Sequence, residues 1–392
     1  MQMIFFFKRN IIILSLCFGF FLIKMGNAAI APVGHLPSVS VGVTPSIYAL
    51  PILLVEKRGE WADFGIQINL KIYRTGEEQL DRAVGNEWEV GIMDPFNAIK
   101  GGNEGNLVIV GVAGNFAKHL PFLLKEESVF FNRDKLGKWA KAFKSEKMTE
   151  GENIFLPGCL VAITNYADTR KTLVIRWLEG YLRGLRIMQE NREEAAGVLQ
   201  AFYREKLEVE FPKAILQQEL AKAFFFEEKN IDEIFRVIGG EASAFEKTAH
   251  SLTNYLMMSK DLEAKEDPKE YTLFKLIEQL STIRKEALSQ LEKTRLAIEE
   301  AAKAGTNVEE FRKVWEEARG QIREGRGYLR IIGVLSGLQR KAEQARVAGE
   351  RLQNLRKIEL IIGIMLALYY MGYALYRKKR NGSISKLPSA QF

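Results

Sequence analysis

VSVGV at residues 39–43, IQINLKI at 66–72, WEVGIM at 88–93 and LVIVGV at 107–112 are four strand-like runs within a single stretch of the chain. The second run alternates apolar and polar residues, which is the period of a strand with one buried face. The fourth run is apolar throughout, as in a strand that is covered on both faces. Helix signals separate the runs, and strands that alternate with helices predict a parallel, right-handed α/β sheet.

Helix-start residues follow three of these runs. Thr44-Pro45-Ser46 offers a capping hydroxyl and a proline, so we expect a helix from about Pro45 toward Gly59 or Gly65, bent or delayed by Pro51. Thr75-Gly76-Glu77-Glu78 is typical of a capping box. Asp94-Pro95 predicts another helix start.

The segments EKRGEWADFGIQINL, TG, RAVGNEWEVGIMDP and LVIVGVAG together resemble the first lobe of a known family. These are the periplasmic substrate-binding proteins of the nitrate, sulfonate and taurine ABC-importer group, related to the pyrimidine-precursor binders for thiamine. The resemblance resumes more weakly from Tyr166 to Phe202, which is similar to the return helices of the family. It implies a type II periplasmic-binding-protein-like α/β domain over residues 29–255.

Compared with that family, this chain has a short segment where the second lobe is expected. Members of the family carry a second lobe at this point and grip the ligand between the two lobes, whereas only residues 115–165 are available here. That length is at the lower end of the range for a domain. We therefore expect a second lobe that is reduced or replaced, and closure around a ligand does not follow from the resemblance.

The amino terminus has the pattern of a secretion signal. Lys8 and Arg9 precede the apolar run Ile11–Ile23, and small residues follow at 26–29, which predicts a signal peptide over residues 1–28. An uncleaved anchor is the alternative. Leu16 stands before Cys17 where a lipoprotein signal needs a small residue, so we expect no lipidation.

The carboxyl end has the pattern of a membrane anchor. Residues 358–376 contain an uncharged apolar run that begins at Leu360, and the basic cluster Arg377–Arg380 follows it directly. We expect one transmembrane helix here, with residues 377–392 as a cytoplasmic tail; a buried core helix is the alternative. The chain is then a single-pass protein of the bacterial cytoplasmic (inner) membrane, with most of its residues periplasmic.

Between these parts, residues 262–357 are rich in charge and have apolar residues at helical spacing. The pattern pauses at Ala304-Gly305-Thr306-Asn307 and then resumes, which predicts an antiparallel helical hairpin as a stalk. Either this stalk forms a coiled coil that makes a homo-oligomer, or it packs on its own lobe.

Residue types that carry catalysis are scarce. The three histidines are scattered, and no phosphate-loop signature occurs, so we expect no enzyme, metal or cofactor. Cys159 is either a nucleophile or, as we favour, a small buried core residue. The net charge of +7 does not indicate nucleic acid, because the arginine-rich stretch 319–326 lacks interleaved aromatic residues and is typical of a solvated helix face.

A ligand site is expected where the parallel strands end. In open α/β sheets, ligands bind outside the carboxyl ends of the strands, and helix starts at this edge present free N–H groups to an anion. The same residues are also ordinary helix caps, which is the alternative interpretation. The candidate ligand-binding residues are Thr44, Ser46, Tyr48, Thr75, Gly76, Asp94 and Asn115.

Two functions follow from this pattern. The first is a membrane-anchored solute-binding protein that works with an ABC permease and binds a nitrate-, sulfonate- or taurine-like anion or a pyrimidine-like amine. The second is a receptor-derived module without transport, which docks a partner protein or oligomerises through its stalk. A 47% hydrophobic and 27% charged composition fits a folded protein in either case.

Overall fold

The computed structural model describes residues 35–115, 156–222, 225 and 242–384, with side chains as far as Tyr376. The predicted signal peptide, most of the reduced second lobe and the end of the predicted cytoplasmic tail lie outside the described residues. They remain predictions.

A five-stranded sheet forms the centre of the α/β lobe, a name we use for Ser38 to Met258. Its strand order is β2-β1-β3-β5-β4. β1 pairs in parallel with β2 and with β3, whereas β5 pairs antiparallel with both β3 and β4. The strands are β1 (Ser38–Val43), β2 (Gln67–Ile72), β3 (Val90–Met93), β4 (Leu107–Asn115) and β5 (Pro157–Ile163).

The four predicted strands, β1 to β4, run parallel to one another as expected, whereas β5, a strand that the sequence did not predict, runs antiparallel between β3 and β4. β4 ends at Asn115 and β5 begins at Pro157, and these two residues are paired. The chain thus re-enters the sheet from the edge at which it left, and a strand that does so must run in the opposite direction. Cys159 lies in β5 and is fully buried, as expected of a core residue.

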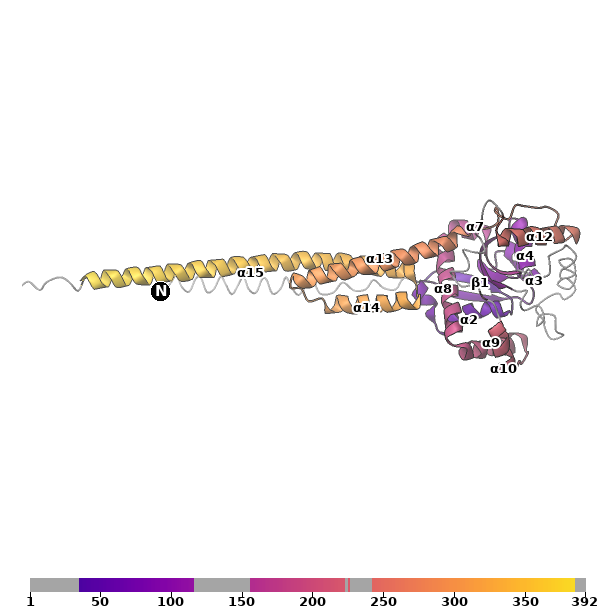
Figure 1. Cartoon of the computed structure of the whole chain (residues 1–392), viewed down its shortest axis with the longest axis horizontal. Coiled ribbons are helices and arrows are strands. Elements are labelled where there is room, and N and C mark those ends of the chain that lie inside the picture. Colours follow the sequence, from indigo (N-terminus) through magenta and orange to yellow (C-terminus); the bar gives the residue numbers. More distant parts are fainter. Residues whose placement is uncertain (1–34, 116–155, 223–224, 226–241, 385–392) are drawn as a thin grey trace, which may run out of the picture. The chain divides into compact units, whose positions relative to one another are not determined.

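Helices cover the sheet in two groups. α2 (Leu50–Lys57), α8 (Lys171–Glu190) and α9 (Arg192–Leu207) pack against one another, with α10 (Lys213–Lys222) against α9. α4 (Pro95–Asn103) packs against α3 (Gly76–Val84) and α12 (Ala244–Met258). Figure 1 shows β1 between α2 and α8 on one side and α3 and α4 on the other. The short helix α7 (Thr164–Thr169) follows β5.

The first predicted helix begins later than the capping pattern indicates. Ile47–Ala49 form a short 3-10 helix, η1, and α2 starts only at Leu50. Pro51 then lies in the first turn of α2, where its missing N–H is not needed. The predicted starts after Thr75 and Asp94 are confirmed, because both side chains cap the helices that follow them.

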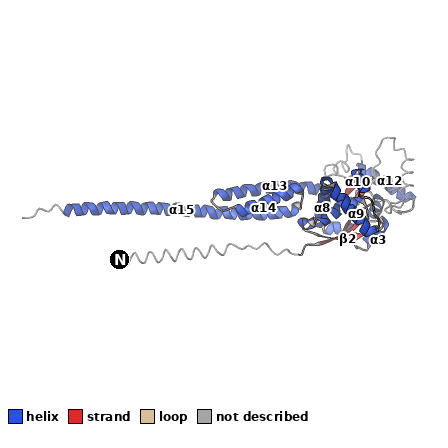
Figure 2. Ribbon diagram, turned by 90° about the horizontal axis from the view of Figure 1, so that it is seen from below, coloured by secondary structure: helices blue, strands red, loops and turns tan. Residues whose placement is uncertain are grey.

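Residues 275–384 form three helices where the sequence predicts a hairpin followed by a separate membrane helix. They are α13 (Lys275–Lys303), α14 (Glu309–Glu324) and α15 (Tyr328–Ile384). The second predicted helix is broken at Gly325, whose φ of 72° is the left-handed conformation that ends many helices. We call α13, α14 and the start of α15 the bundle, and the three helices lie side by side in both views (Figures 1 and 2).

The predicted membrane segment is part of α15 rather than a helix of its own. Within the described residues, the stretch Tyr328–Tyr376 is the one helix long and apolar enough to cross a membrane, and its most apolar window has no residue buried inside the protein. By length and composition, then, this helix is a candidate span.

Candidate functional site

The carboxyl ends of the four parallel strands, β1 to β4, lie at one edge of the sheet, which we call the carboxyl edge. The pairing places Val43 of β1 beside Ile72 of β2 and Ile92 of β3. Met93, the last residue of β3, is paired with Cys159, near the start of β5. The segments that follow β1, β2, β3 and β4 therefore start from the same edge, as the topology predicts.

Gly76 and Asp94 are in direct proximity at this edge. A Cβ atom added to Gly76 would lie 2.1 Å from Oδ2 of Asp94 and 2.5 Å from Nδ2 of Asn97. The first turn of α3 thus packs onto the start of α4 with no space for a side chain. The structure therefore brings together two of the predicted segments, Thr75-Gly76 and Asp94-Pro95.

The Asp94 carboxylate is used within its own helix. Its Oδ1 accepts hydrogen bonds from the backbone N–H of Phe96 (3.0 Å) and Asn97 (3.1 Å), and Oδ2 accepts one from Nδ2 of Asn97 (2.8 Å). Burial raises the pKa of Asp94, and these hydrogen bonds partly oppose that rise. Burial, together with the charge of Asp94, raises the pKa of the Cys159 thiol, so Cys159 is a poor nucleophile here.

Thr75 is an N-cap, with Oγ1 accepting the N–H of Glu78 at 3.1 Å. The Glu78 carboxylate does not complete a capping box with Thr75, because its Oε2 accepts the N–H of Arg74 instead, at 2.8 Å. Glu77 and Glu78 place two acidic residues in the first turn of α3. These charges oppose the binding of an anion at this helix start.

The segment Thr44 to Tyr48 lies at the same edge. The backbone N–H of Ser46 donates to the carbonyl of Thr44 at 2.7 Å, and Ser46 precedes η1 without a capping bond from its side chain. Tyr48 belongs to the buried core, with its ring 5.2 Å from that of Phe225. Burial raises the pKa of the Tyr48 hydroxyl.

Asn115 links the last residue of β4 to the segment that enters β5. Its Oδ1 accepts the N–H of Leu156 at 2.9 Å, which ties the end of β4 to the start of β5. Phe225 forms an isolated bridge with Gly114 beside it. The carboxyl edge thus includes the start of β5 and Phe225, both of which the sequence reasoning missed. No local sequence pattern places either of them at the carboxyl edge.

Gln79 is a further buried polar residue that the sequence reasoning missed. Its Nε2 donates to the carbonyl of Gly42 (2.9 Å) and to that of Ile92 (3.1 Å), and it therefore links β1 and β3 behind the edge. The sequence signal that could have identified Gln79 is a glutamine on the apolar face of α3. Such a residue needs buried hydrogen-bond partners.

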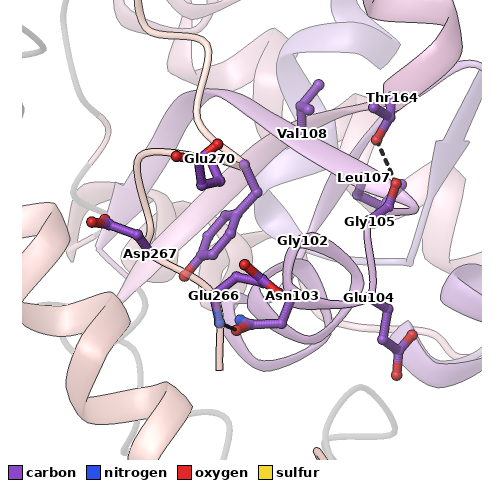
Figure 3. A pocket seen from close by; sticks show the side chains of 11 residues that line it. Gly102, Asn103, Glu104, Gly105, Leu107, Val108, Thr164, Glu266, Asp267 and Glu270 are labelled. Atoms are coloured by element: carbon purple, nitrogen blue, oxygen red, sulfur yellow. Dashed lines mark hydrogen bonds between the residues drawn. The ribbon is translucent and has the colours of Figure 1, made fainter. Parts of the chain in front are cut away.

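A separate cavity of about 610 Å³ opens at the other edge of the sheet (Figure 3). It lies between the end of α4, the start of β4 and the segment 266–271. Hydrogen bonds shape its wall: Thr164 Oγ1 donates to the Gly105 carbonyl (2.9 Å), and the Glu266 N–H donates to Asn103 Oδ1 (2.8 Å). Its acidic lining residues are Glu104, Glu266, Asp267 and Glu270.

These carboxylates do not form a metal centre. Within the described part of the chain, no three His, Cys, Asp or Glu side chains are placed so that they could hold a metal ion. The sequence reasoning had no signal for this cavity, because segment 266–271 comes from a part of the chain far from α4 and β4.

The lobe is the predicted α/β fold in its alternation of strands and helices, with β5 as an antiparallel strand within the sheet. No protein-family model and no curated protein matches the chain. Solved structures that are similar to it include the alkanesulfonate-binding protein SsuA from Xanthomonas axonopodis pv. citri bound to MOPS. That match is 10% identical, with a TM-score of 0.43, and covers 61% of this chain and 99% of that chain.

Two further similar structures are also binding proteins. The periplasmic nitrate-binding protein NrtA from Synechocystis PCC 6803 is 11% identical, with a TM-score of 0.40, over 63% of this chain and 89% of that chain. The ligand-binding component of an ABC-type import system from Staphylococcus aureus, with zinc bound, is 10% identical, with a TM-score of 0.38, over 62% and 99%. Because these identities and TM-scores are low, the description of the α/β fold rests on the strand order and strand pairing of this chain itself.

Proposed function

We propose that this chain is a membrane-anchored extracytoplasmic solute-binding protein of the ABC-importer type. The observation that carries the proposal is the packing of Gly76 on Asp94 at the carboxyl edge, where β1, β3 and β4 of a mixed α/β sheet all end. Helix starts at that edge supply N–H groups for a small anion or a polar amine. The candidate span in α15 supports an anchor.

The candidate ligand is a nitrate-, sulfonate- or taurine-like anion or a pyrimidine-like amine. The remaining candidate contacts are Thr44, Ser46, Tyr48, Thr75 and Asn115, which line or flank the same edge. Glu77 and Glu78 favour a ligand that also carries a cationic or hydrogen-bond-donating group. Taurine-like zwitterions and pyrimidine-like amines are therefore preferred over nitrate.

A thermal-shift screen of the full chain in detergent tests the proposal. The screen compares nitrate, bicarbonate, taurine, alkanesulfonates and pyrimidines. One of them is expected to raise the Tm, because a ligand that binds only the folded state stabilises it. No shift with any of these solutes contradicts the solute-binding function.

A pair of capping variants separates binding from stability. Thr75→Ala and Asn191→Ala each remove an N-cap, at a cost of about 1 kcal/mol, since Asn191 Oδ1 accepts the Glu194 N–H at 3.1 Å on α9. Only Thr75→Ala is expected to lose the ligand-induced shift. An equal shift in the two variants removes Thr75 from the site.

The second candidate function is a receptor-derived module that docks a protein or oligomerises. It is favoured by the internal use of the polar groups at the carboxyl edge, because Asp94, Thr75 and Asn115 all accept hydrogen bonds from the chain itself. Leu288 and Leu296 are about half exposed on α13 and offer an apolar contact. If this function holds, Leu288→Glu with Leu296→Glu lowers the mass measured by light scattering in detergent.

A further inference from the structure

A buried ion pair lies where the lobe meets the bundle. Nε of Arg183, on α8, donates to Oε2 of Glu60 at 2.9 Å, and Nη2 donates to Oε1 at 3.4 Å. Glu60 belongs to the short helix η2 (Glu60–Phe64), and the two residues are only 7% and 4% exposed. Removing the Glu60 carboxylate would leave the buried Arg183 guanidinium without its nearest counter-charge, so this contact resists opening.

The corner between α14 and α15 is attached to the same pair. Nη2 of Arg326 lies 3.3 Å from Oε1 of Glu60, and its Nη1 lies 3.5 Å from Oδ2 of Asp63. Nη1 of Arg183 also donates to the Glu324 carbonyl at 3.3 Å. Two carboxylates of η2, the guanidinium group of Arg183 on α8 and that of Arg326 at the corner thus form one network.

Backbone packing at the corner is equally close. A Cβ atom on Gly327, whose φ is 56°, would lie 2.1 Å from the carbonyl oxygen of Asp63. Arg330, in the first turn of α15, donates from Nη1 to the Ala62 carbonyl at 3.3 Å. The first turn of α15 is therefore seated on η2. We call these contacts, together with the ion-pair network, the joint.

From the joint onward, α13 and α14 brace α15. Thr306 Oγ1 donates to the Ala345 carbonyl (2.9 Å). Thr294 Oγ1 lies 3.2 Å from the Leu335 carbonyl oxygen and 2.8 Å from the Gln290 carbonyl oxygen of its own helix, so its one hydrogen is shared between them. Gln353 Nε2 reaches the Lys303 carbonyl at 3.4 Å, at the far end of α13. Two apolar clusters fill the bundle between these bonds; their buried members are Ala287, Ala297, Ile298, Ala301, Val308, Ala318, Ile322, Tyr328, Ile331, Leu335, Leu338 and Ala342.

The uncharged apolar run starts shortly after this brace ends. α15 is continuous from Tyr328, through Gln353 and Leu360, to Ile384. At about 1.5 Å per residue, the helix rises about 38 Å from Tyr328 to Gln353 and about 48 Å from Tyr328 to Leu360. The joint and the start of the apolar run are thus separated by a helix that is braced for most of its length.

We propose that the bundle is a rigid spacer, which holds the lobe at a set height of about 48 Å along α15 from the apolar core of the bilayer. This proposal rests on the membrane anchor proposed above. It assigns a function to the bundle that requires neither a bound solute nor self-association. A partner that meets the lobe at that height must itself extend well out from the membrane, unless α15 bends beyond Gln353, where the brace ends.

Energy transfer from the protein to acceptor dyes on lipid headgroups tests the height. Full chain in nanodiscs carries one donor dye at Val84→Cys on the lobe, Val334→Cys near the joint or Leu355→Cys near the membrane, all exposed positions. Transfer is expected to be strong from residue 355 and weak from residues 334 and 84. Strong transfer from residue 334 or 84 overturns the spacer.

Pulsed electron spin resonance between labels at Val84→Cys and Val347→Cys tests the rigidity of the joint. A narrow distance distribution is expected, and it broadens when Glu60→Gln removes one charge of the buried network. The control is Glu87→Gln, which removes an exposed ion pair with Arg82 at 2.9 Å and leaves the distribution narrow. A broad distribution in the unaltered chain overturns the proposal even if Glu60→Gln does not fold.

The two proposals fail in different ways. A chain that stays out of the nanodiscs contradicts the anchor and with it the spacer. A chain that inserts but gives strong transfer from residue 334 contradicts the spacer alone. The thermal-shift screen reports on solute binding in either case.

Discussion

At the scale of single residues, Glu179 is a buried titratable group on α8, near the first residues of α15. It is 3% exposed on α8, and burial raises its pKa to about 8, against the opposing influence of the Leu329 and Tyr328 amides and of Arg176. Between about pH 4.5 and pH 8, the folded chain therefore keeps a proton on Glu179 that the unfolded chain has lost.

Stability is consequently expected to be highest at the acidic end of this window and to fall as the pH rises toward 8. Glu179→Gln removes this loss, because an amide does not ionise. The variant should be more stable than the unaltered chain at pH 8 by a few kcal/mol, at about 1.4 kcal/mol per pKa unit. Urea unfolding at several pH values measures the effect.

The control for that prediction is Glu205→Gln, at an exposed position on α9. Because the side chain is exposed, this substitution should change the free energy of unfolding by no more than about 0.5 kcal/mol at any pH. Equal pH profiles for Glu179→Gln and the unaltered chain would contradict the assignment of a protonated Glu179.

At the scale of elements, the contact between α8 and α2 depends on a glycine. A Cβ atom on Gly184 would lie 2.1 Å from the Pro51 carbonyl oxygen and 2.6 Å from its Cα. Backbone atoms cannot move aside as a flexible side chain does, so Gly184→Ala is expected to push α8 away from α2. We predict a loss of about 1–3 kcal/mol in the free energy of unfolding.

Gly197→Ala is the matched control on the neighbouring helix α9. No atom lies within 4 Å of an added Cβ at this position. The substitution should be neutral or stabilising by up to about 1 kcal/mol, because alanine favours a helix interior. If both substitutions have the same effect on urea unfolding, the close approach of α8 and α2 is wrong.

At the scale of the whole molecule, the proposed anchor predicts where the chain partitions. Ending the chain after Lys357 removes every residue of the apolar run and leaves the joint and the brace intact. The shortened protein should appear in the soluble fraction after cell fractionation, whereas the full chain stays with membranes after carbonate washing. A full chain released by carbonate contradicts the anchor.

The spacer also changes what the solute-binding proposal requires. A permease that offers its docking surface near the bilayer would not meet a lobe held about 48 Å along α15 from the apolar core. Either α15 bends beyond Gln353, where α13 no longer braces it, or the partner carries an extended domain outside the membrane. The energy-transfer measurement distinguishes these two arrangements.

Local patterns were enough to predict much of the lobe. The alternation in β2 and the apolar run of β4 identify strands, because side-chain period depends on the backbone alone. The caps at Thr75 and Asp94 were predicted for the same reason, since each bonds within three residues along the chain. The start of α2 was predicted too early, because Pro51 competes with the capping pattern at Thr44-Pro45-Ser46.

Contacts between distant segments were beyond the reach of those patterns. The placement of β5 between β3 and β4 depends on which strands pair, and pairing partners are not encoded in a local period. The sequence did not identify Gly325 as the position of the break, because several glycines occur in what it predicts as a single helix. The sequence predicted that the candidate ligand residues share one edge of the sheet. It did not predict that Gly76 packs against Asp94 or that Asn115 accepts a hydrogen bond from Leu156.

By itself the sequence determined the strands β1 to β4, the starts of α3 and α4, the helical character of residues 275–376 and the apolar run in α15. Each of these follows from periodicity, capping or composition over a few turns of chain. Only the tertiary structure decided the antiparallel β5, the three-helix bundle and the joint of Glu60, Arg183 and Arg326. Those features depend on burial, and a charge is buried only where folding brings its partner from a distant segment.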